Sequence, residues 1–199
     1  MKHLFVLFFI ILSGCSFAQE NELISNTSDL VIESLKINEI NPTYQKESDS
    51  INDILKTSLA LHLKHKKSDQ KVSKIFHQLY KNGSSIYSDS PEVRRMKQRR
   101  SVCFGSIALL SDYDVSLTFI DYAKYSLAGS IKEPDIEFLE APFLGLLFIE
   151  ILLKYENNEL TENDLQVLEL FISQHKENLS KEIIHKSENL LSNYKKISQ

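Results

Sequence analysis

Apolar residues return every three or four positions along most of the chain from about residue 28 to the C-terminus. Residues with this spacing lie on one face of an α-helix, so the pattern predicts a succession of amphipathic helices. The first helix is expected to begin at Ser28 and to run to about Ile37, stopped by Asn41-Pro42, with Leu30, Val31, Leu35 and Ile40 as its apolar residues. The other helices are expected to begin at Asp49 or Ser50, at Asp69, at Ser90, between Ser111 and Asp114, at Glu133, at Thr161 and at Ser180.

Capping residues mark several of these helix ends. Ser90-Pro91-Glu92 combines an N-cap serine, a first-turn proline and a first-turn acid, and it predicts a helix that runs to about Leu110. Thr161 is followed three residues later by Asp164, which resembles a capping box with Asp in place of Glu. Gly83 stands where a left-handed glycine would end the helix that begins at Asp69.

The segment Phe143–Tyr155 is apolar on every side except at Glu150 and Lys154. A helix of this kind is buried by its neighbours all round. Its length of about 13 residues is too short to span a bilayer, which needs about 20. Pro142 is expected to break or kink the preceding helix, which starts at Glu133-Pro134-Asp135.

The composition also favours helices. Of 199 residues only 5 are Gly and 4 are Pro, whereas β-sandwiches and barrels need many turns and therefore more of both. With 42% apolar residues, the chain is not disordered over its whole length. We therefore predict an all-α fold of about seven to eight helices, forming a single domain over residues 28–199. The helices are expected to form either stacked αα-hairpins or an irregular helical bundle.

The spacing of the helix starts resembles that of a helical repeat. Pro91 and Pro134 lie 43 residues apart, and the partner helices expected near Asp114 and Thr161 lie 47 apart. Helical hairpins of about 40 to 47 residues are the unit of HEAT-type solenoids. The sequence SPEVRR at 90–95 also resembles the opening of a HEAT repeat. The resemblance implies stacked hairpins whose grooves offer a contact surface.

The N-terminus has the features of a bacterial targeting signal. A short basic start is followed by the apolar run Leu4–Leu12, which is too short to cross a membrane. Leu12-Ser13-Gly14-Cys15 resembles the lipobox of bacterial lipoproteins. The resemblance implies a signal peptide over residues 1–14 and lipidation of Cys15, which would anchor the protein in a membrane. Residues 15–27 are then expected to be a tether.

The lipobox interpretation places the protein in the bacterial cell envelope. Ser16, directly after Cys15, is not acidic, and residues 16–20 do not resemble the acid-rich segments that direct some lipoproteins to the cell surface, so we expect the protein to face the periplasm from its membrane. An alternative is cleavage after Ala18, which would give a soluble periplasmic or secreted protein that begins at Gln19.

Charge and cysteine content exclude several classes of protein. The net charge is −4, and loss of residues 1–14 removes only Lys2, leaving 22 basic residues against 27 acidic ones. We expect no nucleic-acid partner for such an acidic protein. Cys103 would be the only cysteine beyond Cys15, so no intramolecular disulfide is expected. The motifs GxSxG, GxxxxGK(S/T), GxGxxG and CxxC do not occur, and we expect no cofactor.

Two groups of residues are candidates for contact with a partner. Five of the seven residues 94–100 are Lys or Arg. They can pair with nearby acids, or they can contact an acidic partner or anionic lipid; the candidates for such contact are Arg94, Arg95 and Arg99. Aromatic side chains at helical spacing fill a core or form an exposed edge. The candidates for such an edge are Tyr122 and Tyr125, with Tyr113 and Phe119 on the same helix.

Three charged residues are candidates for burial. The helical stripe through Met96 and Cys103 also contains Arg100, and Glu150 is the one acid in the most apolar segment. A buried guanidinium needs a carboxylate partner, so we expect Arg100 to pair with Glu150 or with Glu140. The alternative is that these charges bind a ligand or a partner. Cys103 itself is expected to be buried and unreactive.

His62 and His65 lie three residues apart and could both face a metal ion. A zinc site needs three or four ligands, and lysines surround this pair in the sequence. We therefore interpret the two histidines as the edge of an amphipathic helix and expect no metal.

These features favour a lipid-anchored envelope protein that acts as a non-enzymatic binding or scaffold module. Its expected partners are the membrane, through the N-terminal lipid, and another envelope protein. One alternative is an immunity-type inhibitor of a periplasmic toxin, because a small acidic protein can cover a basic cleft. The other alternative is an enzyme that uses a carboxylate in an apolar pocket around Glu150.

Overall fold

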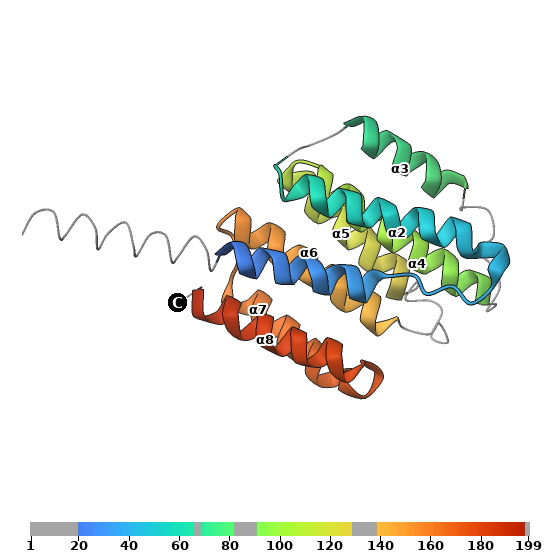
Figure 1. The fold of residues 1–199 in the computed structure, drawn as a ribbon. Helices are drawn as coiled ribbons and strands as arrows, with labels where there is room; N and C mark the ends of the chain where they lie inside the picture. The colour runs from blue at the N-terminus through green and yellow to red at the C-terminus, as the bar shows by residue number, and fades with distance from the viewer. Residues whose placement is uncertain (1–19, 66–68, 82–90, 129–138, 198–199) are drawn as a thin grey trace, which may run out of the picture.

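The computed structural model describes residues 20–65, 69–81, 91–128 and 139–197, and this part of the chain is helical without any β-strand (Figure 1). The predicted all-α class is therefore confirmed. The first helical segment covers residues 20–35. The others are α2 (Pro42–His62), α3 (Asp69–Lys81), α4 (Pro91–Leu110), α5 (Tyr113–Ala128), α6 (Glu140–Glu156), α7 (Glu162–Gln174) and α8 (Lys181–Ile197), with the short 3-10 helix η1 (Lys176–Asn178) between the last two.

The expected tether is wrong for residues 20–27, because they form the first half of the helix over residues 20–35. Ser28 does not cap a helix; it lies inside this one and its hydroxyl donates to the carbonyl of Ile24. The buried side of the helix includes three polar residues, Thr27, Ser28 and Ser34, as well as Leu23 and the later leucines. These polar positions interrupt the apolar pattern, so the pattern predicts a helix that begins too late.

The Asn41-Pro42 pair begins a helix where we expected it only to end one. The Asn41 side chain accepts a hydrogen bond from the backbone N–H of Thr43, and Pro42 occupies the first helical position, where its missing N–H costs nothing. The helix expected to begin at Asp49 or Ser50 therefore begins at Pro42. Ile40, expected on an apolar helix face, is 95% exposed in the connecting segment.

Helix ends with local capping chemistry lie where the sequence predicts them. Thr161 and Asp164 form the predicted capping box at the start of α7, and each side chain binds the backbone N–H of the other. The hydroxyl of Ser180 accepts a hydrogen bond from the N–H of Ile183 at the start of α8. Pro142 does not break a helix, because it lies in the first turn of α6. Gly83, Ser90 and Glu133-Pro134-Asp135 lie outside the described residues.

The central helix of the bundle is α6, which is buried along most of its length, as predicted. The helix over residues 20–35 (blue in Figure 1) crosses it on one side, α4 and α5 form a hairpin beside it, and α7 and α8 form a second hairpin on its other side. In a linear stack each repeat contacts only its neighbours. Here Thr27 and Glu33 of the first helix bind Tyr194 and Lys186 of α8, at 2.9 and 2.6 Å. Of the two expected architectures, the structure is therefore the irregular bundle and not the linear stack of hairpins.

In the described part of the chain, we find no helix with both the length and the hydropathy that crossing a membrane requires. The expected signal peptide over residues 1–14 and the lipidation site Cys15 lie outside these residues.

Candidate functional site

The outer face of α5 carries two exposed tyrosines. Tyr122 and Tyr125 are 54% and 59% exposed, whereas Ile120, Ala123 and Leu127 on the opposite side of the helix are buried. The two tyrosines lie one helical turn apart, so they share a face. The sequence left two interpretations open for these tyrosines, core packing and an exposed edge. The structure shows the exposed edge.

Aromatic rings from three helices continue this edge into a surface. Phe119 lies at the centre, with its ring centroid 5.7 Å from that of Phe76 on α3, 6.2 Å from Phe104 on α4 and 6.3 Å from Tyr122. Phe104 and Tyr122 are also in ring contact, at 5.9 Å. Centroid separations of this size are typical of stabilising aromatic pairs. We call these four residues together with Tyr125 the aromatic surface.

Phe76 and Phe104 are members of this surface that the sequence analysis did not identify. Phe76 is exposed although it is a large apolar residue, and Phe104 and Phe119 are partly buried beneath the exposed rings. No spacing rule relates side chains on different helices, so only the packing of α3 against α4 could reveal the group.

The arginines expected to contact a partner are engaged within the chain. Arg95 pairs with Glu39 at 2.8 Å, and its guanidinium lies 4.7 Å from the centre of the Tyr44 ring. Arg99 pairs with Glu47 at 2.8 Å, and its guanidinium lies 5.7 Å from the centre of the same ring. The two arginines therefore bind α4 to the first turns of α2 and to the segment that precedes α2. The side chain of Arg94 lies outside the description.

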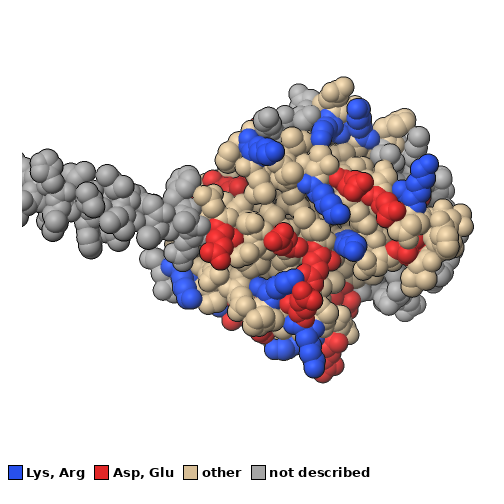
Figure 2. Space-filling model, in the orientation of Figure 1, with Lys and Arg blue, Asp and Glu red and all other residues tan. Residues whose placement is uncertain are grey.

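Ion pairing of this kind is general on the face that Figure 2 shows, where basic and acidic residues are interspersed over the first helix, α2 and α8. Examples are Lys186 with Glu33 and Glu182, and Lys195 with Glu169. This visible face has no large field of one sign. Such exposed pairs contribute little to stability.

The expected pairing of Arg100 with Glu150 or Glu140 is wrong, because other residues bind these two acids. Glu150 is bound by two lysines, Lys124 of α5 at 2.9 Å and Lys154 of α6 at 2.8 Å. The buried arginine is Arg99, which is 7% exposed, whereas Arg100 is half-buried. Both arginines are three or four residues from Met96, so the spacing alone could not decide which of them faces inward.

Glu150 belongs to a continuous charged network between α5, α6 and α7. Lys154 binds Asp164 at 2.6 Å as well as Glu150. Burial lowers the pKa of Lys154, but its hydrogen bonds to Asp164 and Glu150 raise that pKa by more. The carboxylate of Glu150 is therefore an acceptor between two ammonium groups. It is not the isolated carboxyl group in an apolar pocket that the enzyme alternative requires. Glu140 accepts a hydrogen bond from Asn178 at 3.0 Å.

His62 joins the ends of three helices. Its Nδ1 lies 2.8 Å from the carbonyl oxygen of Leu109 and its Nε2 lies 2.6 Å from Glu156. A carbonyl oxygen can only accept, so Nδ1 carries a proton, and the carboxylate favours a proton on Nε2 as well. Burial lowers the pKa of His62, but the hydrogen bond and charge of Glu156, with the Leu109 carbonyl, raise it by more. His62 thus connects three helix ends, and this arrangement favours its protonated form; it is not simply a helix-edge residue.

His65 lies in the turn after α2 and adopts a left-handed backbone conformation, with φ of 50°. In the described part of the chain, we find no group of three or more His, Cys, Asp or Glu that could hold a metal ion.

Cys103 lies in the core, where the sequence placed it. It is fully buried on α4. Burial raises the pKa of its thiol to about 12, although the charge of Arg99 lowers it slightly. A thiol in this state is unreactive at neutral pH.

Comparison of the chain with known protein families, with curated proteins and with solved structures finds no match.

Proposed function

We propose that this protein is a lipid-anchored envelope module that binds another envelope protein through the aromatic surface, and that it carries out no reaction of its own. The anchor is Cys15, in the lipobox-like sequence Leu12-Ser13-Gly14-Cys15. The observation that carries the binding proposal is the exposure of Tyr122 and Tyr125 above a layer of packed rings.

Rigid aromatic side chains are the residues from which protein interfaces draw much of their binding energy. Tyrosine is enriched at interface hot spots because it offers a large apolar area and loses little conformational freedom on binding. Contacts with Phe104 and Phe119 hold the Tyr122 ring from beneath, so the ring is ordered before a partner arrives.

The charges beside the aromatic surface indicate the chemistry of the partner. Asp114 and Asp121 are exposed on α5, and Asp121, which neighbours Tyr122 in the sequence, pairs with Lys124 at 3.0 Å. The protein as a whole is acidic. A partner surface with an apolar centre and a basic rim would complement this arrangement.

The test is affinity capture from solubilised envelopes with Cys15 intact. The unmodified chain is compared with a Tyr122→Ala, Tyr125→Ala double variant and with a control variant, Val167→Ala with Leu170→Ala. The control residues are also exposed and apolar but lie on α7. A protein captured specifically is then purified, and its affinity for all three chains is measured by calorimetry.

Loss of the two tyrosines is expected to weaken binding by at least about tenfold, because hot-spot side chains each contribute about 2 kcal/mol or more. The control variant is expected to bind like the unmodified chain. The binding proposal is wrong if the tyrosine variant keeps full affinity for every captured protein. The anchor is tested separately by mass spectrometry of the mature N-terminus, where a free Gln19 in place of an acylated Cys15 would contradict it.

A further inference from the structure

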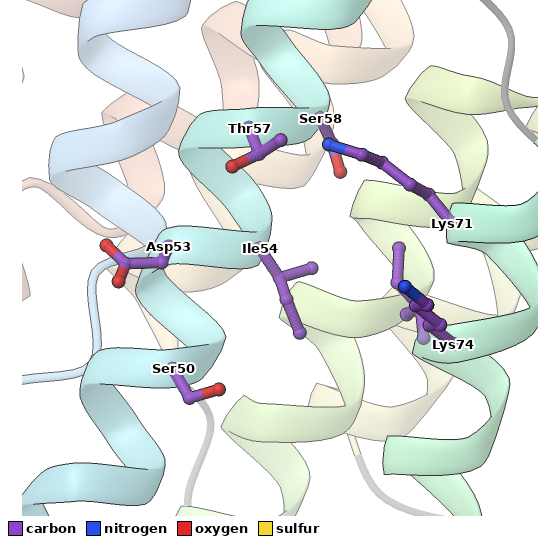
Figure 3. Close-up of a pocket in the computed structure, with 8 residues that line it drawn as sticks. Ser50, Asp53, Ile54, Thr57, Ser58, Lys71 and Lys74 are labelled. Atoms are coloured by element: carbon purple, nitrogen blue, oxygen red, sulfur yellow. The ribbon is translucent and has the colours of Figure 1, made fainter.

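A second feature, separate from the aromatic surface, is a pocket of about 320 Å³ between α2 and α3 (Figure 3). Ser50, Ile54 and Ser58 lie on one face of α2, since they are four residues apart. Lys71 and Lys74 face them from α3, one turn apart. Pockets for small molecules begin at about this size.

The two lysines bring positive charge to this pocket without acidic partners. Within the described ranges no carboxylate pairs with Lys71 or Lys74, whereas the half-buried lysines of α5 and α6 both bind acids. Asp53 lines the rim, but Figure 3 shows its carboxylate on the side of α2 that points away from the lysines. Lys71 is half-buried and Lys74 is exposed, so water solvates both in the free protein and their charge remains available to a ligand.

Ser58 supplies a hydroxyl that opens into the pocket and is also available to a ligand. The residue is 2% exposed, and its side chain lines the pocket beside the end of Lys71 (Figure 3). Other buried serines inside helices, such as Ser106 and Ser187, donate to the carbonyl four residues earlier. No such partner of the Ser58 hydroxyl is found among the described residues. Unlike the hydroxyl of Ser34, the Ser58 oxygen is not sealed from solvent, so it can exchange a hydrogen bond to water for one to a ligand.

The remaining walls of the pocket indicate what kind of molecule could carry the anionic group that the two lysines would bind. Ile54 and Ile75 form an apolar strip, and the Ser50 hydroxyl stands at the far end of the same α2 face. Ser50 and Ser58 are eight residues apart, which corresponds to roughly 12 Å along a helix. The pocket can therefore hold a short carbon chain with a charged group at one end and a hydroxyl near the other.

We propose that this pocket binds the phosphate ester of a small hydroxylated molecule, of which glycerol phosphate is the simplest. The phosphate lies between Lys71 and Lys74 and accepts the hydrogen bond of Ser58. Phosphate carries nearly two negative charges at neutral pH and has several acceptor oxygens, so it matches two ammonium groups and a hydroxyl better than a single carboxylate does. The carbon chain lies on Ile54 and Ile75, and its hydroxyl group reaches Ser50.

The test is calorimetric titration of the full chain in detergent with glycerol phosphate. Saturable binding is expected, and it should be weakened at least tenfold in a Lys71→Gln, Lys74→Gln variant and about tenfold by Ser58→Ala, which removes one hydrogen bond to a charged group. The matched control is Lys56→Gln with Lys64→Gln. It removes the same charge from exposed positions outside the pocket and should change the affinity less than twofold.

Two further titrations distinguish the source of the phosphate ester. A water-soluble short-chain phosphatidylglycerol that binds more tightly than glycerol phosphate identifies the ligand as a lipid headgroup, and the reverse order identifies a soluble phosphate ester. Either order supports the pocket if the same variants weaken the binding.

The proposal is overturned if neither compound shows saturable binding. It is also overturned if the two lysine variants weaken binding equally, which would indicate general charge attraction. Equal affinity for inorganic phosphate would overturn the ester part. Circular dichroism confirms that each variant is folded.

Discussion

The contact between the first helix and α6 is close enough to be tested by adding a single methyl group. Gly145 lies in the middle of α6, and a Cβ atom placed there would be 2.9 Å from Cγ of Leu35 and 3.1 Å from Cβ of Ser34. Both atoms belong to the helix over residues 20–35. The Ser34 Cβ is attached directly to the backbone, so the Gly145→Ala variant can be accommodated only if the first helix moves.

The expected cost follows from two opposing terms. Overpacking of a tightly packed site costs typically about 1 to 3 kcal/mol. Alanine in place of glycine inside a helix gains up to about 1 kcal/mol from helix propensity. We therefore expect Gly145→Ala to lower the free energy of unfolding by about 1 kcal/mol, which corresponds to a fall in melting temperature of about 2 to 4 °C for a chain of this length.

Gly105 in α4 provides a matched control. A Cβ atom there would lie 3.1 Å from Cδ2 of Leu146 and 3.3 Å from Cδ1 of Ile149. These atoms are terminal methyl groups that can move by side-chain rotation, so the overpacking cost is small and the gain in helix propensity remains. Gly105→Ala is expected to be neutral or stabilising by up to about 1 kcal/mol.

Urea unfolding followed by circular dichroism measures both variants under the same conditions. The reasoning requires Gly145→Ala to be less stable than Gly105→Ala by about 1 to 2 kcal/mol, from the terms above. Equal stabilisation by the two substitutions would refute it. Such a result would mean that the first helix is not seated on α6 in the way the structure describes.

Two further predictions concern the ends of helices. Because the pKa of His62 is raised in the folded state, the stability it contributes is fully present below its unfolded value of 6.5 and is lost as pH rises through the folded value. The unmodified chain should therefore exceed His62→Gln in free energy of unfolding by more at pH 6 than at pH 9; a difference that is the same at both pH values would contradict the ion pair with Glu156. Thr161→Ala removes the capping box with Asp164 and is expected to lower the free energy of unfolding in urea by about 1 kcal/mol. The control Thr118→Ala, at an exposed position inside α5, should be nearly neutral. Equal effects of the two substitutions would count against the cap.

Features that depend on neighbouring residues were predictable for this chain. The capping box at Thr161, the start of α4 at Pro91 and the burial of the apolar segment in α6 all follow from residues a few positions apart. The burial of Cys103 follows from helical spacing in the same way. Each of these contacts forms within one or two helical turns, so the residues that determine it can be read together.

The beginning of the first helix could not be found by the same means. Its polar positions Thr27 and Ser34 face inward, and Thr27 is satisfied by the hydroxyl of Tyr194, 167 positions away. Asn52 likewise fixes the segment after this helix by binding both backbone groups of Ile37. A polar residue in a sequence pattern is interpreted as a surface residue unless its buried partner is known.

The candidate sites show the same division. The sequence by itself determined that the chain is helical, that Tyr122 and Tyr125 share one face of a helix, and that charges such as Glu150 would need partners. Only the tertiary structure decided that this tyrosine face is exposed, that Phe76 joins it, and that lysines rather than Arg100 bind Glu150. The reason is physical: helical periodicity fixes which residues share a face, but the neighbouring helix that covers a face, or leaves it open, comes from a distant part of the chain.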